Sequence, residues 1–245
     1  MLLENMSYVE IEAYLLEKDT VLIPIGSVEQ HSPYGLIGTD FITAEAIARE
    51  VGKRMDLIVA PTLPYGMSQH HMAFAGSVTF SPETMVNVVK DITKSFLEHG
   101  FKRIIFINGH GGNINPVKTA FDQLKYENYK GLFEIISWFL LPEVQDIEKG
   151  LFGDKNGHHA TPGEVSITKF LRPEVFSNKA HIEGNVEKIE AYWPLSKEEF
   201  KSVYPDGRME SAPWLAKESY GKLIMEEAVR VISNKIRHIL KLEIL

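Results

Sequence analysis

Apolar residues recur along the chain in two patterns that alternate. Short unbroken apolar runs, which are typical of buried parallel strands, end at glycine, proline or polar residues. Such runs occupy residues 21–26, 57–61, 103–108 and 132–141. The stretches between them carry apolar residues at helical spacing. These stretches predict helices at residues 40–54, 81–100, 115–127, 161–171 and 217–241.

The alternation of strands and helices predicts the fold class. It favours an α/β fold in which a mostly parallel sheet is covered by helices on both faces. No linker, repeat or low-complexity stretch interrupts the pattern, so residues 1–245 are expected to form a single domain. Residues 142–160 and 172–213 are expected to be long loops, which on such scaffolds form binding sites or subunit contacts.

Composition excludes several classes of function. Apolar residues make up 44% of the chain and charged residues 24%, as in ordinary globular proteins. The net charge of −7 argues against a general nucleic-acid binder, because no excess of Lys and Arg can neutralise phosphates. The absence of cysteine excludes disulfides, thiolate metal sites and a cysteine nucleophile. No Gly-x-Ser-x-Gly elbow occurs, which argues against a serine hydrolase.

The hydropathy pattern also bears on location. The stretch "MLLENMSYVEIEAYLLEKD" lacks the basic segment and the apolar core of a signal peptide. Nowhere do about 18 apolar residues run together, so no membrane span is expected. These observations predict a cytoplasmic protein.

Histidine and carboxylate residues follow each predicted strand. In an open parallel sheet, ligands bind beyond the carboxyl ends of the strands, so these residues are expected to meet at one edge. They are Glu29, His31 and Asp40 after the first strand, "YGMSQHHMAF" (65–74) after the second, "NGHGGN" (108–113) after the third and "GHHATPGE" (157–164) after the fourth.

This set of side chains suits a metal site. Histidine and carboxylate together are ligands for Zn, Mn or Fe(II). Glu29 and His31 point to the same side of an extended segment, so they reach one ion or serve two neighbouring ions. Two ions about 3.5–4 Å apart need a bridging group, and Asp40 is placed to provide it. His110 and Glu164 complete the predicted ligand set.

Other interpretations of the same residues remain open at this point. Glu29 and His31 are also compatible with solvated loop residues, and Asp40 with a helix N-cap. "NGHGGN" is compatible with a phosphate-binding turn at a helix N-terminus, although it lacks the lysine of a P-loop. Two histidines have no companions in sequence and are expected at the surface: His99 and His181.

Several blocks together resemble the creatininase family, that is, creatinine amidohydrolase and its relatives. The blocks extend over most of the chain, and the first and third are the most specific. They are "PIGSVEQHSPYGLIGTD", "PYGMSQHHMAFAGSVTFSPET", "INGHGGN", "HATPGEVSI" and, less closely, "PDGRMESAPWLAKESYGK".

The resemblance implies a three-layer α/β/α fold and a binuclear metal centre that hydrolyses C–N bonds of amides. Carried over by position, Glu29 and His110 hold one ion, His31 holds the other, and Asp40 bridges them. The family also commonly forms ring-like or dihedral assemblies, which implies a homo-oligomer such as a hexamer.

The resemblance further implies roles in catalysis and substrate binding. His159 falls where the family has a substrate-facing histidine that protonates the leaving nitrogen, and Glu164 aligns with the acid of the same block. Glu164 is expected to act as a metal ligand or as a proton relay. The residues expected to contact the substrate or its oxyanion are His71, Gly111, Gly112 and Trp138.

The chain departs from creatinine amidohydrolase at two instructive places. Gly112 stands where that enzyme has a glutamate ligand, so Glu164 is the expected replacement. No tryptophan occurs shortly before His159, where that enzyme has one. A flat ring therefore loses an aromatic partner. Weak or absent turnover of creatinine is expected.

The resulting hypothesis is a metal-dependent amidohydrolase. Two divalent ions (Zn, Mn or Fe(II)) are expected to activate a water that attacks a small cyclic or linear amide. One alternative is a formamide deformylase or a peptidase that uses the same centre. Another is a non-catalytic metal- or phosphate-binding regulator.

Overall fold

A parallel sheet forms the middle of the structure, a computed structural model that describes residues 1–177, 179, 183–184, 186 and 188–244. Within these residues the sheet has four strands in the order β2-β1-β3-β4. All three pairings are parallel. The strands are β1 (Thr20–Ile25), β2 (Ile58–Val59), β3 (Arg103–Asn108) and β4 (Leu132–Ser137).

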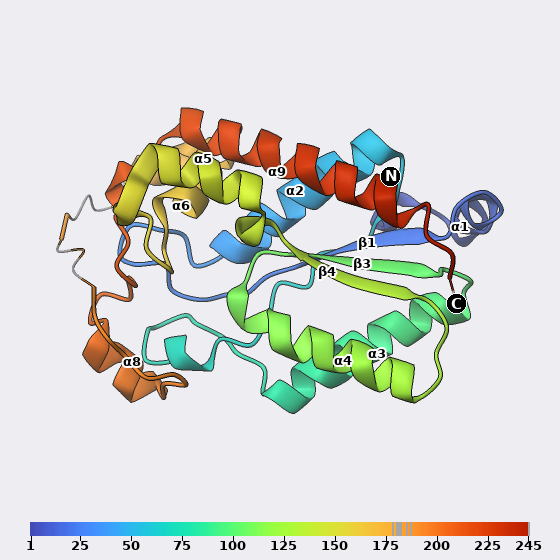
Figure 1. Ribbon diagram of the computed structural model, residues 1–245, viewed down its shortest axis with the longest axis horizontal. Coiled ribbons are helices and arrows are strands. Elements are labelled where there is room, and N and C mark those ends of the chain that lie inside the picture. Colours follow the sequence, from blue (N-terminus) through green and yellow to red (C-terminus); the bar gives the residue numbers. More distant parts are fainter. Residues whose placement is uncertain (178, 180–182, 185, 187, 245) are drawn as a thin grey trace.

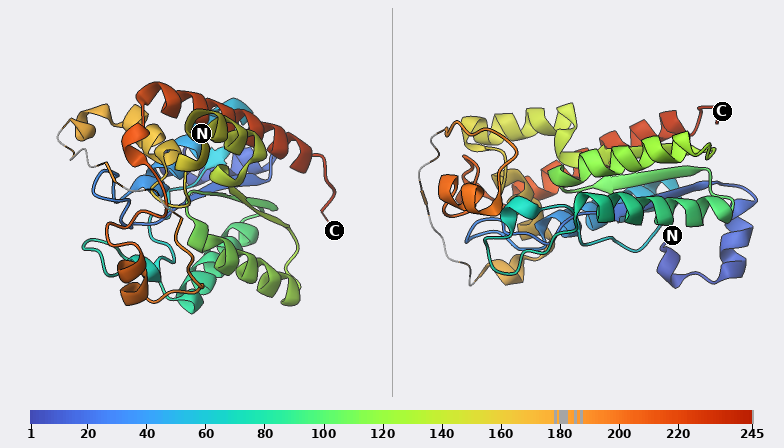
Figure 2. Two further views of the ribbon diagram at one scale, coloured as in Figure 1. Left: turned by 60° about the vertical axis from the view of Figure 1, so that its left-hand side comes forward. Right: turned by 90° about the horizontal axis from the view of Figure 1, so that it is seen from below.

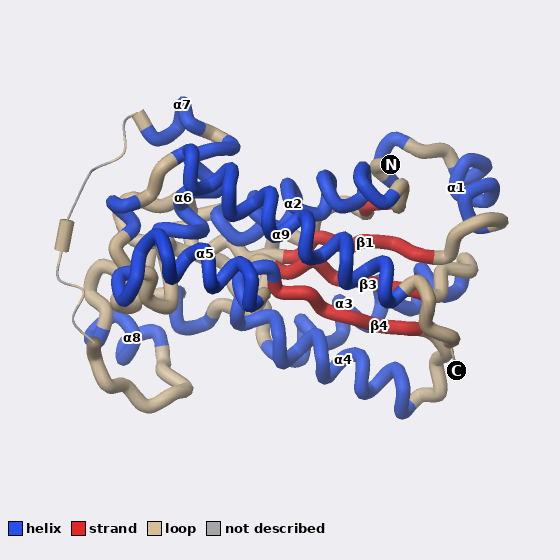
Figure 3. The backbone as a smooth tube through the Cα atoms, turned by 45° about the horizontal axis from the view of Figure 1, so that its top comes forward, coloured by secondary structure: helices blue, strands red, loops and turns tan. Residues whose placement is uncertain are grey.

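Helices cover both faces of this sheet (Figures 1 and 3). One layer contains α2 (Thr39–Met55), α5 (Pro142–Phe152), α6 (Pro162–Leu171) and α9 (Glu218–Ile239). The opposite layer contains α3 (Pro82–Glu98) and α4 (Ile114–Tyr126), which lie side by side below the sheet in the left view of Figure 2. The predicted three-layer α/β/α fold is confirmed.

The central strands are apolar between their polar end residues because both of their faces are covered. Side chains alternate along a strand, so Val21 and Ile23 pack toward α3 and α4 while Leu22 packs toward α2 and α9. β3 alternates in the same way and pairs with β1 from Thr20–Arg103 to Ile25–Asn108. Its last residue, Asn108, therefore lies beside the end of β1.

Shorter elements surround the layers. α1 (Tyr8–Leu15) precedes β1, and α7 (Pro173–Phe176) follows α6. α8 (Lys197–Val203) lies beyond the carboxyl ends of the strands, while both chain termini lie at the other end of the molecule (Figure 1). The 3-10 turns are η1 (Leu3–Asn5), η2 (Gln69–His71), η3 (Gly111–Asn113), η4 (Trp138–Leu140), η5 (Gly153–Lys155) and η6 (Pro213–Leu215).

Three expectations about the second half were wrong. Residues 142–160 were expected to be a loop, yet their first part forms α5. Pro142 begins this helix, and Val144, Glu148 and Phe152 are buried along one side at a spacing of four residues. The Gly-, Asp- and His-rich end of the segment hides this pattern in the sequence.

The fourth strand is also shorter than expected. β4 ends at Ser137, and the predicted continuation to residue 141 is instead the turn η4. The predicted loop 172–213 likewise contains α7 and α8. None of the helices among the described residues is long and apolar enough to cross a membrane.

Candidate metal centre and active site

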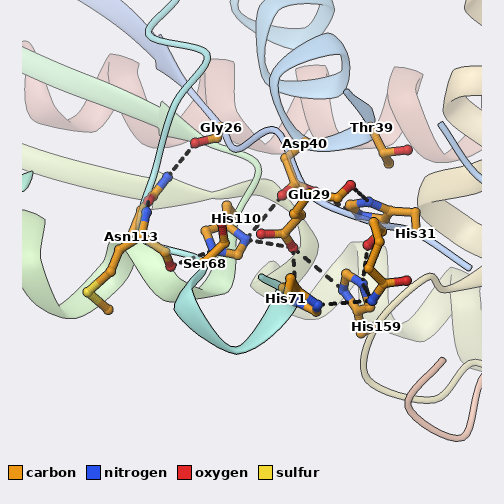
Figure 4. Close-up of polar contacts among 12 residues, drawn as sticks. Gly26, Glu29, His31, Thr39, Asp40, Ser68, His71, His110, Asn113 and His159 are labelled. Carbon is orange, nitrogen blue, oxygen red and sulfur yellow. Dashed lines mark hydrogen bonds and ion pairs between the residues drawn. The ribbon is translucent and has the colours of Figure 1, made fainter. Parts of the chain in front are cut away.

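The predicted ligands gather where β1 and β3 end against the first turn of α2 (Figure 4). Asp40 is the second residue of α2, and the N-cap is Gly38, so Asp40 is not the cap of this helix. A Cβ on Gly109 would lie 2.1 Å from the Asp40 carbonyl oxygen. Glycine after β3 therefore lets the chain approach α2 closely enough to bring His110 to Asp40.

Asp40 faces two histidines with its two oxygens. His31 Nε2 lies 2.9 Å from Asp40 Oδ1. His110 Nδ1 lies 3.0 Å from Asp40 Oδ2 and 3.1 Å from Glu29 Oε1. A carboxylate between two separate imidazole groups has the arrangement that a bridging ligand requires.

The ligand atoms form overlapping groups that could hold metal ions. Within each group the atoms lie within 4.8 Å of one another. One group is Glu29, Asp40 and His110, and a second is His31, Asp40 and Glu164. A third joins Glu29 and His31 to His159. The residues present therefore fit metal ions that prefer nitrogen and oxygen ligands.

Unpaired polar atoms support this fit. Among the described residues, no hydrogen bond of good geometry reaches Glu29 Oε2, Asp40 Oδ2 or His31 Nε2, although all are buried. His31 Nε2 and Asp40 Oδ2 keep an ion-pair contact within the cluster, whereas Glu29 Oε2 has none among the described residues. Burying such an atom without a partner costs on the order of 1–3 kcal/mol. A cation bound between them would remove that cost.

Each of the two histidines beside Asp40 is held in its orientation by a hydrogen bond from its other ring nitrogen to a backbone carbonyl oxygen. His31 Nδ1 donates to the Glu29 carbonyl oxygen at 3.1 Å. His110 Nε2 donates to the Met67 carbonyl oxygen at 2.9 Å. The other nitrogen of each ring then faces the carboxylates, which is the usual arrangement of metal-binding histidines.

The two carboxylate oxygens of Glu164 have different partners. Oε1 accepts from the Thr161 amide at 2.5 Å and closes a capping box at the start of α6. Oε2 lies 3.9 Å from His31 Nε2. Burial raises the pKa of Glu164 to about 7, against the opposing effect of His31.

The other ionisable groups show that the site favours positive charge. Burial acts to raise the pKa of Glu29 and Asp40, but the adjacent histidines outweigh it and lower both to about 2. Burial acts to lower the pKa of His31, yet Asp40 raises it to about 10. The pKa of His110 is likewise well above its usual value because Glu29 and Asp40 outweigh burial. Metal ions would replace these protons.

Two further histidines lie beside Glu29. His71 Nε2 is 3.4 Å and His159 Nδ1 is 3.7 Å from Glu29 Oε1. Burial lowers the pKa of His71 well below its usual value. Burial and, next, His31 lower the pKa of His159 to about 3. Both rings therefore favour the neutral form.

A cavity of about 420 Å³ opens onto these residues. Its walls come from the strand ends on one side and from the segment after β4 on the other. Glu148, buried in the wall formed by α5, accepts from Asn156 Nδ2 at 3.2 Å. The lining residues include Glu29, Asp40, His110, Gly111, Phe139, Leu140, Gln145, Glu148, Lys149, His158, His159 and Glu164.

The predicted substrate contacts lie in different places. Gly111 lines the cavity. Gly112 packs away from it, since a Cβ there would lie 2.1 Å from the Met67 carbonyl oxygen. His71 is buried beside Glu29. Trp138 is only 1% exposed and belongs to the apolar core, so the structure corrects the expectation that it contacts substrate.

Sequence reasoning missed several residues of the cavity wall. Phe139 and Leu140 face the cavity because β4 ends before them and the turn η4 redirects the chain. Glu148 was missed because its segment was expected to be a loop. The signal available was its place at helical spacing between Val144 and Phe152.

The two isolated histidines are simpler. His99 is exposed at the end of α3, as expected. His181 lies outside the described residues.

Comparison with known proteins now gives the family. A family model described as creatinine amidohydrolase matches residues 4–236. The chain belongs to the creatininase family. It is accordingly a creatininase-family amidohydrolase, which confirms the resemblance seen in the sequence blocks.

The relatives carry different activities in their names. A mycofactocin precursor peptide peptidase of Mycobacterium ulcerans is 28% identical over 86% of this chain and 81% of its own length. The creatinine amidohydrolase of Pseudomonas putida is 24% identical over 95% of each chain. Family membership thus leaves the substrate undetermined.

Solved creatininase-family structures show the same fold. A crystal structure of creatinine amidohydrolase (creatininase) aligns with a TM-score of 0.83 at 22% identity, covering 99% of this chain and 98% of that one. A manganese form of creatininase aligns with a TM-score of 0.81 at 22% identity, covering 98% of this chain and 99% of that one.

Proposed function

We propose that this creatininase-family protein is a metal-dependent amidohydrolase whose centre holds two divalent ions. The observation that carries the proposal is Asp40, whose two oxygens face His31 and His110 separately. It belongs to two of the candidate ligand groups at once. A single mononuclear site would not need this arrangement.

The ligand assignment follows from the groups. Glu29 and His110 would hold one ion and share Asp40 with the other. His31 and Glu164 would complete the second ion's ligands. Gly112 has no side chain to offer, and its surroundings leave no room for one without moving the Met67 carbonyl. Glu164 Oε2 is the carboxylate oxygen available in its place.

Bound divalent ions supply Lewis acidity and lower the pKa of water, which provides a nucleophile at neutral pH. The chain supplies the remaining functions. His159, neutral and beside Glu29, is placed to exchange a proton with the substrate. The turn that begins at Gly111 lies in the cavity wall, where its backbone amides could stabilise an oxyanion.

The cavity indicates a small or flexible amide as substrate. Its volume of about 420 Å³ is in the usual range for small-molecule sites. Trp138 is in the core, and the aromatic side chain that lines the cavity is Phe139. We expect little turnover of creatinine and better hydrolysis of another small amide, because a carboxylate ligand supplied by Glu164 instead of position 112 would change where the attacking water lies.

A peptide end is the second candidate substrate. The first observation in its favour is the relationship to a peptide peptidase over most of the chain. The second is that Gln145, Lys149 and His158 of the cavity wall are exposed, so a longer chain could leave the cavity on that side.

The test is hydrolysis of a panel that contains creatinine, formamides, lactams and short peptides, with Mn, Zn and Fe(II) supplied in turn. Elemental analysis should find close to two ions per chain, and anomalous scattering should place Asp40 between them. A specificity constant for creatinine of about 10⁴ M⁻¹s⁻¹ or more would contradict the substrate expectation. Full activity after complete metal removal would contradict the proposed chemistry.

A further inference from the structure

Gln30, between Glu29 and His31, contacts both neutral histidines of the site. Its side-chain Nε2 lies 2.9 Å from His71 Nδ1 and 3.0 Å from His159 Nε2. The same atom donates to the Gly207 carbonyl oxygen at 2.8 Å. The whole group is buried.

The orientation of the Gln30 amide is fixed by its other end. Oε1 accepts from the Ser32 backbone amide at 2.8 Å. A backbone N–H can only donate, so the atom at this position must be the oxygen. Nε2, with two hydrogens to give, is then the atom that faces the histidines.

Counting hydrogens settles which nitrogen of each ring is protonated. His159 Nε2 lies 2.7 Å from the Gln30 backbone carbonyl oxygen. A carbonyl oxygen only accepts, so His159 Nε2 must carry the hydrogen. It is then unable to accept from the Gln30 side chain. One side-chain hydrogen goes to Gly207 and the other to His71 Nδ1.

The result is the same tautomer for both rings. His71 accepts at Nδ1, so its hydrogen is on Nε2, which lies 3.4 Å from Glu29 Oε1. His159 has its hydrogen on Nε2 and a lone pair on Nδ1, which also faces Glu29 Oε1. His71 and His159 lie next to each other in Figure 4, with Glu29 beside them.

We propose that Gln30 is a positioning residue that fixes the protonated nitrogens of His71 and His159. His159 Nε2 is committed to the Gln30 backbone carbonyl, so His159 turns a free, unprotonated Nδ1 toward Glu29 and the cavity. His71 is held with its Nε2–H toward the same carboxylate oxygen.

Gln30 also joins three segments that are distant in sequence. Gly207 has a φ of +82°, and a Cβ there would lie 1.9 Å from Gln30 Oε1. The segment after it pairs with the strand-like residues around His159, since the His158 amide donates to the Met209 carbonyl oxygen at 2.8 Å. Gln30 therefore connects the loop after β1, the turn η2 and this C-terminal segment around His159.

The test is two-bond ¹H–¹⁵N NMR of histidine-labelled full-length protein, with diamagnetic Zn²⁺ and without metal. The signals are assigned with His71→Gln and His159→Gln. We expect both rings in the wild type to show the neutral Nε2–H pattern. In Gln30→Glu an acceptor replaces the Nε2 donor, so His71 should become protonated at Nδ1. Gln30→Met removes the donor without adding an acceptor, and His71 should then populate both tautomers.

The matched control is Gln69→Met, because Gln69 is exposed on η2 and its side chain makes no hydrogen bond among the described residues. It should leave both histidine patterns unchanged. On the best amide of the hydrolysis panel, Gln30→Met should lower kcat on the order of tenfold to a hundredfold while KM changes less.

Three results would overturn the inference. They are a wild-type His159 protonated at Nδ1 while neutral, direct zinc coordination by His159 Nδ1, and an unchanged His71 pattern in both Gln30 variants. The catalytic meaning of the tautomer rests on the proposed function, but the tautomer itself is measured without turnover. A protein with the expected spectra and no hydrolysis of any amide would therefore refute the proposed function and leave the tautomers standing.

Discussion

The two walls of the cavity differ in how completely the fold fixes them. On the wall built from strand ends, Glu29 and His31 are each 1% exposed and Asp40 is 2% exposed. Each of these side chains is held by the others or by the backbone. On the wall built from η4 and α5, Leu140 is 50% exposed and Lys149 points to solvent.

We infer from this difference that the two walls have different roles in catalysis and in substrate selection. A side chain in the first wall cannot change without leaving a buried charge or donor unpaired, so this wall fixes the type of chemistry. An exposed side chain in the second wall, such as Leu140, can change with little effect on folding, so we expect this wall to set which amide enters. The predictions below test that division, from the largest expected effect to the smallest.

Asp40→Asn should abolish most activity. Asparagine is neutral, so it removes the negative charge between His31 and His110. Loss of a hydrogen-bond partner of a metal ligand typically lowers metal affinity or activity by about 10–100-fold. Loss of a bridging ligand should lower activity by about a thousandfold or more. Metal content per chain and amide hydrolysis are the measurements. Asp122→Asn, at an exposed position on α4, is the matched control. Retention of two ions and full activity in Asp40→Asn would refute the bridging role.

Glu148→Gln tests the one buried carboxylate of the second wall. Burial raises the pKa of Glu148 to about 7, against the opposing hydrogen bond from Asn156. The folded state therefore binds this proton more tightly than the unfolded state does. Stability should be fully present below pH about 4.5 and fall as the pH rises through about 7, by roughly 3 kcal/mol.

In metal-free protein, Glu148→Gln should flatten this part of the pH dependence and be more stable than the wild type at pH 8. Chemical unfolding at a series of pH values measures the difference. Glu143→Gln, at an exposed position in the first turn of the same helix, should behave like the wild type. If the difference in the free energy of unfolding between the wild type and Glu148→Gln did not vary with pH, Glu148 would not be the group responsible for the pH dependence.

Glu164→Gln should weaken one ion and spare the other. Glutamine keeps an oxygen for the Thr161 amide, so the start of α6 stays capped, but it loses the charge at Oε2. Affinity for one ion should fall by about 10–100-fold in a chelator competition titration. Lost turnover with both affinities intact would instead make Glu164 a proton relay.

Leu140→Ala should have the smallest effect. Because Leu140 is half exposed, its truncation should change the free energy of unfolding by no more than about 0.5 kcal/mol. It lines the cavity, however, and should shift the relative kcat/KM for large and small amides by a few-fold. A uniform loss of activity toward every amide would place Leu140 in the catalytic wall.

The residues of the first wall could be predicted from the sequence better than those of the second. Glu29, His31, Asp40 and His110 could be predicted to meet because short apolar runs identify β1 and β3, and parallel strands present their ends at one edge. The second wall depends on where β4 stops. The apolar run continues through Trp138 into η4, so sequence alone extends the strand and misses the turn that brings Phe139 and Leu140 to the cavity.

Gln30 shows a different limit. Its neighbours in the sequence are obvious candidates for a site, but no pattern tells where an amide side chain points. Its partners, His71, His159 and Gly207, are 41, 129 and 177 residues away. Contacts of this kind become visible only once the tertiary structure is known.

The shared carboxylate of Glu164 has a consequence for local dynamics. The same side chain that caps α6 through Thr161 approaches His31 with its second oxygen. An ion held there would stiffen the start of this helix by withdrawing Glu164 from the open conformations that release its cap. Amide hydrogen exchange in the first turn of α6 should therefore slow as the second ion binds. The exchange rate of this turn would then report the occupancy of the second ion without any measurement of hydrolysis.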